Sequence, residues 1–185
     1  TTGGTGEDAA TTGPALVDHR PLQSPVKDQG ERGTCLAFAV CASLEAQPGM
    51  PADLAEEYLH QRFVELNAEG NPDYDRANGG VHPATLQNFW SELAVCEERF
   101  FPTSNTVEPT SIPAAATRNA TIRFESVERL RTPTPAQLEA ILASGRDVIL
   151  QVIANFSPSA IPASGIIDRA NAGGQNVHFM LAVGY

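Results

Sequence analysis

Cys35 stands where a loop rich in Gly and Asp gives way to a run of good helix formers, CLAFAVCASLEA, over residues 35–46. The backbone N–H groups at the start of a helix have no intrahelical partner, and together with the helix dipole they stabilise negative charge. A thiol in that place favours the thiolate, which is the nucleophilic form of cysteine. Free cysteine is also common as a small buried apolar residue, so position alone leaves both interpretations open.

His178 and Gln29 could complete a site around such a nucleophile. His178 lies in the apolar segment QNVHFMLAVGY, where a histidine is more often a core residue than a catalyst. It follows Cys35 by 143 residues, within the roughly 130–150 residues that separate the two groups in one class of Cys–His enzymes. Gln29 lies just upstream of Cys35, and its side-chain amide could donate to an oxyanion. Gly30 and Gly33 would let the intervening loop fold tightly.

The other cysteines and histidines have weaker cases for chemistry. Cys41 and Cys96 suit core positions, and three cysteines in all leave at least one thiol free. Neither a CxxC pair nor a zinc-type spacing occurs. Glu57 and His60 could form half of a metal site on a helix, but no second half accompanies them. We therefore expect no metal and no cofactor.

The elements that must position these residues are helical in the first half of the chain and mostly β in the second. We expect helices from Cys35 to just before Pro48, over residues 52–68, from Pro83 onward and over 135–144, the last capped by Thr134. Strands are expected over 122–127, 148–153 (buried) and 177–183, with 102–121 as a crossing between lobes. Segregated elements of this kind predict an α+β fold.

Composition excludes some classes of function. The net charge of −10 and the single lysine, Lys27, argue against a nucleic-acid binder, which needs clustered basic residues. No apolar stretch is long enough to span a membrane, so we expect no membrane partner. Residues 1–14 are rich in Thr and Gly and read as a flexible leader.

The segment PVKDQGERGTCLAFA (residues 25–39) resembles the signature around the active-site cysteine of the papain-like cysteine peptidases. Four further segments follow in that family's order: LAEEYL (54–59), NGG (78–80), Phe101-Pro102 and VHFMLAVGY (177–185). The resemblance implies a papain-like two-lobe domain over 15–185, with an active-site cleft between the lobes. The helical lobe would take about 30–105, and a β-barrel-like lobe would take about 15–25 and 110–185.

The resemblance also implies roles for individual residues. Cys35 would attack a peptide carbonyl as a thiolate, and His178 as an imidazolium would stabilise it and protonate the leaving amine. The Gln29 amide and the Cys35 backbone N–H would form the oxyanion hole, and water would resolve the thioester. The implied substrate is a peptide or protein, bound by Gly33, Asn78, Gly79, Gly80, Val81, Val177 and Phe179.

Several departures from the family pattern are informative. Arg32 and Ala77 replace both halves of one family disulfide, so the chain resembles a variant of bacterial type whose fold does not depend on an oxidising compartment. That loss slightly favours the cytoplasm over secretion. Leu36 replaces the usual Trp after the nucleophile. Phe179 replaces a small residue beside the pocket for the second side chain before the cut. With Val81 and His82 as neighbours, it predicts a preference for small or medium apolar side chains.

The family's orienting Asn, in an "NSWG" motif, has no counterpart here, because the chain stops at Tyr185. Asn155 and Asn176 lack the context of that motif. We expect the C-terminal part of the β lobe to be missing, and a separate C-terminal polypeptide could complete it. Two alternatives to a peptidase stay open: a transpeptidase or ligase on the same fold, and a non-catalytic binding or scaffold module.

Overall fold

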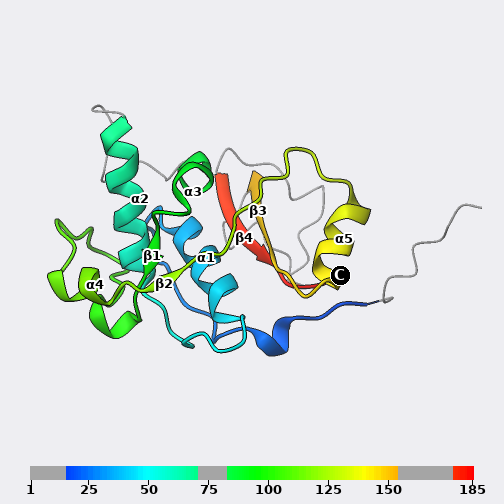
Figure 1. Cartoon of the computed structure of the whole chain (residues 1–185), viewed down its shortest axis with the longest axis horizontal. Helices are drawn as coiled ribbons and strands as arrows, with labels where there is room; N and C mark the ends of the chain where they lie inside the picture. The colour runs from blue at the N-terminus through cyan, green and yellow to red at the C-terminus, as the bar shows by residue number, and fades with distance from the viewer. Residues whose placement is uncertain (1–15, 71–82, 154–176) are drawn as a thin grey trace, which may run out of the picture.

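A computed structural model describes residues 16–70, 83–153 and 177–185, and its helices and strands are distributed as the α+β expectation requires (Figure 1). The elements are η1 (Arg20–Leu22), α1 (Cys35–Glu45), α2 (Glu56–Gly70), α3 (Pro83–Phe89), β1 (Ala94–Val95), η2 (Glu98–Phe100), α4 (Ala114–Asn119), β2 (Ile122–Arg123), α5 (Pro135–Ala143), β3 (Val148–Ile153) and β4 (Val177–Ala182). The predicted leader over 1–14 lies outside the described residues.

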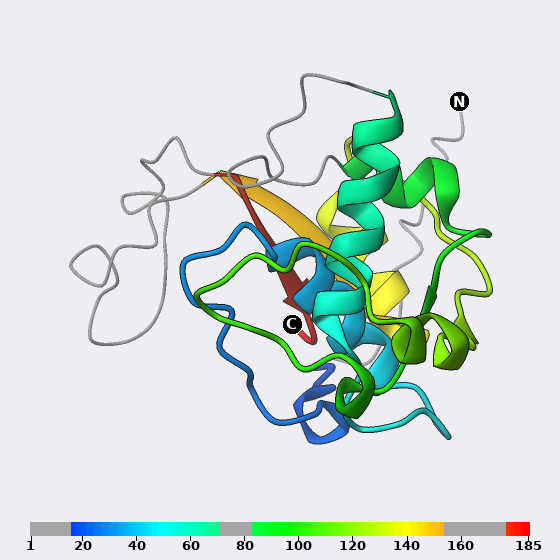
Figure 2. The same ribbon diagram turned by 90° about the vertical axis from the view of Figure 1, so that its left-hand side faces the viewer.

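Helix α1 runs through the main core. It packs against α2 on one side and against β3 and β4 on the other, and Figure 2 shows α1 behind α2. Leu36, Ala37, Val40 and Cys41 are its most buried residues. They join Phe63 of α2 and residues of the strands in one apolar cluster. Burial of this apolar surface holds the helix that begins at Cys35 in place.

A second, smaller cluster contains Ala55, Tyr58, Cys96, Phe101 and Ala116. Its last member belongs to α4, a short helix inside the segment 102–121, which we expected to cross between the lobes. The predicted strand over 122–127 is shorter than expected: β2 comprises two residues and pairs antiparallel with β1. Since α4 and β2 pack on the helical elements, we propose that the crossing between the lobes follows β2.

Strands β3 and β4 form an antiparallel pair that lies between α1 and α5 (Figure 1). Their bounds agree closely with the prediction, and Val152 lies opposite His178. The expectation that β3 is a buried strand is wrong, because none of its residues is buried. Among the described residues these strands do not close into a barrel.

Residues 17–19 lie beside the end of the chain. The backbone N–H of Val17 donates to the Tyr185 carbonyl at 3.2 Å, and the Tyr185 N–H donates back at 3.0 Å. The His19 N–H donates to Val183 at 2.7 Å. Gly184 permits this approach, because a Cβ there would lie 2.3 Å from the Val17 carbonyl oxygen. An antiparallel bridge between Asp18 and Gly184 thus joins this segment to the residues that follow β4.

Helix α5 begins as predicted. Thr134 and Gln137 form a reciprocal capping box, and Pro135 occupies the first turn. Gly145 follows the helix with a φ of +82°, a conformation that favours glycine. None of the helices in the described part of the chain has the length and apolar character needed to cross a membrane.

Candidate active site

Cys35 is the first residue of α1, as the sequence predicts. Thr34 occupies the N-cap position and is buried, and its carbonyl accepts the Phe38 N–H at 3.2 Å to open the helix. The side chain of Cys35 is half-buried and packs against the edge of the main core. The helix start therefore fixes the position of Cys35, and the residue as a whole stays partly accessible.

The other two thiols have a different environment. Cys41 and Cys96 both have 0 % exposure, and no cysteine of the chain is in a disulfide. Burial raises the pKa of Cys41 well above its usual value. Burial likewise raises the pKa of Cys96 to about 11. Both therefore stay protonated at neutral pH, and the expectation that they are core residues is confirmed.

His178 lies on β4 and is half-buried. Burial lowers its pKa below the usual value, which favours the neutral imidazole, the form that can accept a proton. Because α1 packs directly against β4, the elements that carry Cys35 and His178 lie side by side (Figure 1). The fold thus places next to each other the two elements that carry Cys35 and His178.

Gln29 belongs to a tightly folded loop that leads into α1. Its side-chain Nε2 donates to the Arg32 carbonyl at 3.0 Å. The same carbonyl accepts the Thr34 N–H at 2.8 Å. Gly30 has a φ of +63°, and a Cβ there would lie 2.5 Å from the Asn105 carbonyl oxygen. The loop therefore needs glycine at this point, and Gly33 is exposed on it.

Arg32, at the position where the resemblance implies a disulfide cysteine, makes ion pairs. Its guanidinium contacts Glu57, Glu108 and the Ser104 carbonyl. The Glu57 side chain is fully buried, and the Arg32 side chain is 10 % exposed. Sequence reasoning assigned Arg32 no partner. Glu57 was noticed only within the LAEEYL segment and as half of a possible metal site, and nothing in the sequence indicated Glu108.

The predicted substrate-binding residues fall into two groups. Asn78, Gly79, Gly80, Val81 and His82 lie outside the described residues, as do Asn155 and Asn176. Phe179 is 8 % exposed and packs in the main core, whereas Val177 is 51 % exposed. The pocket that we expected them to form stays a prediction.

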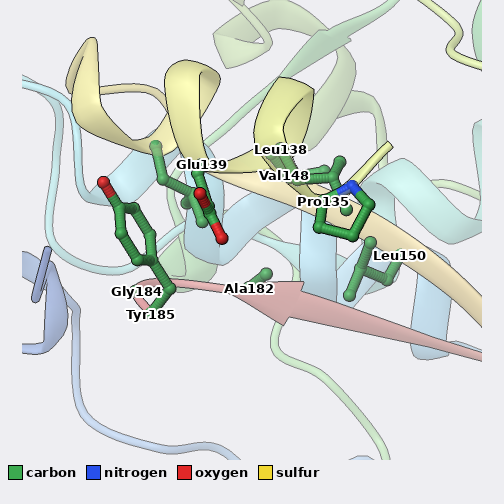
Figure 3. Close-up of a pocket in the computed structure, with 9 residues that line it drawn as sticks. Pro135, Leu138, Glu139, Val148, Leu150, Ala182, Gly184 and Tyr185 are labelled. Atoms are coloured by element: carbon green, nitrogen blue, oxygen red, sulfur yellow. The ribbon is translucent and has the colours of Figure 1, made fainter. Parts of the chain in front are cut away.

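A cavity of about 250 Å³ lies elsewhere, between α5 and the β3–β4 pair (Figure 3). Its lining is mainly apolar and includes Leu138, Leu142, Val148 and Tyr185. None of the predicted site residues lines it. Both residues of the possible metal half-site contact other side chains: Glu57 pairs with Arg32, and His60 lies 3.5 Å from Glu108. Within the described ranges no group of His, Cys, Asp and Glu could hold a metal ion.

Comparison with known proteins supports the resemblance. No family model matches the chain. A curated relative, cysteine proteinase 3 of Entamoeba histolytica, is 30% identical over 84 residues, which make up 45% of this chain and 26% of that protein. The chain therefore spans about a quarter of the length of the relative.

Solved structures match over nearly the whole chain. Xylellain, a cysteine protease from Xylella fastidiosa, matches with a TM-score of 0.63 and 20% identity, covering 94% of this chain and 70% of that one. The Carica candamarcensis cysteine protease CMS1MS2, in complex with E-64, matches with a TM-score of 0.65 and 18% identity, covering 93% and 78%. At identities this low, a structural match establishes the fold alone. The two matches confirm the expected papain-like α+β class.

Proposed function

We propose that this chain, which has the fold of the papain-like cysteine proteases, hydrolyses peptide bonds with Cys35 as nucleophile and His178 as general acid and base. One observation carries the proposal. A half-buried cysteine begins α1, and that helix packs against the strand that carries a half-buried histidine. Known cysteine proteases share this fold, so a cysteine and a histidine on these two elements support a peptidase that uses a thiol nucleophile.

The steps follow from the two side chains. Neutral His178 takes the proton of the Cys35 thiol, and the thiolate attacks the carbonyl carbon of the scissile peptide. The carbonyl oxygen becomes an oxyanion, which the Gln29 amide and the Cys35 backbone N–H stabilise. The imidazolium then protonates the leaving amine, and a thioester forms. Water, deprotonated by His178, cleaves the thioester and restores the thiol.

The burial of His178 supports its part in the first step. A lowered pKa keeps the imidazole neutral, so it can accept the thiol proton. The negative thiolate that results then stabilises the imidazolium, because opposite charges that lie close together favour each other. The same group can therefore act first as base and then as acid.

Selective labelling of the native protein tests the proposal. E-64, with which the Carica protease was crystallised, and iodoacetamide should both modify Cys35 at pH 7.5, while Cys41 and Cys96 stay unmodified because burial keeps them protonated. Peptide mapping by mass spectrometry locates the label. Cys35→Ala should lose both label and peptide hydrolysis, and Cys96→Ala should keep both. Equal labelling of all three thiols would overturn the proposal.

The same samples distinguish the alternatives. A transpeptidase or ligase would transfer the acyl group to an added amine in preference to water, and product analysis separates the two. A binding module would leave Cys35 unreactive, and Cys35→Ala would keep its biological activity. The expected separate C-terminal polypeptide gains no support from the comparisons and stays a prediction, tested by adding such a segment to the labelling reaction.

A further inference from the structure

Arg32 is held by the most extensive set of side-chain contacts near Cys35. Its Nη2 lies 2.9 Å from Glu57 Oε1, and its Nε lies 3.0 Å from Glu108 Oε2. Its Nη1 also donates to Glu57 and to the Ser104 carbonyl. All three guanidinium nitrogens are thus engaged, by groups from α2 and from the segment 104–108.

The backbone of the same residue holds the loop before Cys35. The Arg32 carbonyl accepts the Gln29 side-chain amide at 3.0 Å and the Thr34 N–H at 2.8 Å. Gln29 is the proposed oxyanion donor, and Thr34 occupies the N-cap position of the helix that begins with Cys35. Arg32 therefore connects the ion pairs of its side chain to the loop that carries Gln29, which its backbone carbonyl holds.

The partners of Arg32 are themselves fixed. Glu57 has a fully buried side chain on α2 and also accepts the Ser104 N–H at 3.3 Å. Gln61, one turn further along α2, donates to both Glu57 and Glu108. The close contact between Gly30 and Asn105 adds a steric restraint between the same two segments. The segment 104–108, α2 and the loop thus form one connected unit.

We propose that Arg32 is a positioning residue, which through Glu57 and Glu108 fixes the loop that presents Gln29 to the reaction. The inference rests on the proposed peptidase function. In this chain, ion pairs to Glu108 and to the fully buried Glu57 provide the restraint at a position where the resemblance to the papain-like family implies a disulfide cysteine. Arginine suits the role because its planar fork binds carboxylates bidentately, which a lysine cannot do.

Arg32→Lys tests the proposal with the charge retained. Loss of one oxyanion donor lowers kcat by about 10²–10³-fold in a known hydrolase, so a misplaced Gln29 should lower kcat by roughly 10-fold to 100-fold, with little change in KM. Alkylation of Cys35 by iodoacetamide forms no oxyanion, so its rate should stay near that of the wild type. Arg62→Lys, which alters the Arg62–Glu65 pair on the outer part of α2, is the matched control and should change neither rate.

A double-mutant cycle distinguishes positioning from a general structural role. If Arg32 acts through Gln29, Gln29→Ala combined with Arg32→Lys should be no slower than Gln29→Ala alone. Losses in kcat that multiply, or an alkylation rate that falls in parallel with kcat, would contradict the proposal. A kcat for Arg32→Lys equal to that of the wild type would overturn it as well.

A readout without turnover separates this inference from the proposed function. Amide hydrogen exchange in peptides that cover 27–36 should be faster in Arg32→Lys and in Glu57→Gln than in the wild type or Arg62→Lys, with exchange in α5 unchanged. Unchanged exchange over 27–36 would refute the restraint even if the peptidase is active. If the wild type is neither labelled nor able to hydrolyse peptides, but the two variants still exchange faster over 27–36, only the peptidase proposal is refuted.

Discussion

Lys27 gathers carboxylates where the loop before Cys35 meets the start of α2. Its Nζ lies 2.9 Å from Glu45 Oε1, 2.9 Å from Asp53 Oδ1 and 2.7 Å from Glu56 Oε1. Burial alone would lower the pKa of Lys27, but the hydrogen bonds to these carboxylates raise it above its usual value. The side chains of Glu45 and Glu56 are almost fully buried, and Lys27 supplies the positive charge that faces both of them.

Lys27→Met should therefore be strongly destabilising. It leaves two buried carboxylates without their cation, and breaking a buried ion pair in this way costs about 3–5 kcal/mol. Urea unfolding at pH 7 measures the change in free energy. The control is Arg99→Met, since the Arg99–Glu97 pair is exposed and should contribute less than about 1 kcal/mol. Equal unfolding midpoints for the two variants would show that the buried contacts of Lys27 stabilise the fold no more than the exposed Arg99–Glu97 pair does.

At the scale of elements, helices and strands whose signals lie in their own sequence could be predicted. Those that depend on packing against distant segments could not. Helix α5 carries its own start signal in Thr134 and Gln137, and β3 and β4 follow from short apolar runs between loops. Helix α4 was missed because its sequence is rich in small residues and follows Pro113. The helix lies against η2 and buries Ala116 in the second apolar cluster, and no sequence pattern predicts those contacts.

The burial of β3 was mispredicted for a related reason. An apolar run such as VILQVI suits a strand that is covered on both faces. In this structure Ile153 is 64% exposed, and the whole strand is at most half-buried. Sequence predicts the strand correctly, but the extent of its cover depends on which other elements pack on it.

The pairing between residues 17–19 and 183–185 allows a test at the scale of one element. Gly184→Ala would place a Cβ 2.3 Å from the Val17 carbonyl oxygen, so the two segments must separate. We expect a loss of about 1–3 kcal/mol, which is typical of overpacking, and faster amide exchange in peptides that cover 17–19. Exchange in α2 serves as the internal reference and should not change. Retained protection at 17–19 would contradict the close approach.

At the scale of the whole molecule, polar contacts between distant segments hold the loops to the helices and strands. Arg32 and Glu108 are separated by 76 residues, and His19 pairs with Asp147 across 128 residues at 2.7 Å. Such pairs follow neither the helical nor the strand period, so sequence analysis cannot detect them. The helix start at Cys35 was predicted correctly because it is a local feature, whereas the contacts of Arg32 could be found only in the folded chain.

The same polar cluster predicts how stability depends on pH. His60 is 4% exposed on α2, with Glu57, Glu108 and Arg32 as the charged groups around it. Burial lowers its pKa below the usual 6.5, despite the nearby carboxylates. The unfolded chain therefore binds a proton at this residue more readily than the folded chain does. The stability contributed by neutral His60 is complete above pH 6.5 and is lost as the pH falls toward its folded pKa.

Urea unfolding of wild type and His60→Gln between pH 7.5 and 5.5 measures this contribution. The free energy of unfolding of the wild type should decrease as the pH falls below about 6.5. His178, whose pKa burial also lowers, adds to the same slope. His60→Gln should flatten the slope in part, and His60→Gln with His178→Gln should flatten it further. A wild-type slope that His60→Gln leaves unchanged would mean that His60 is equally easy to protonate in the folded and unfolded chains.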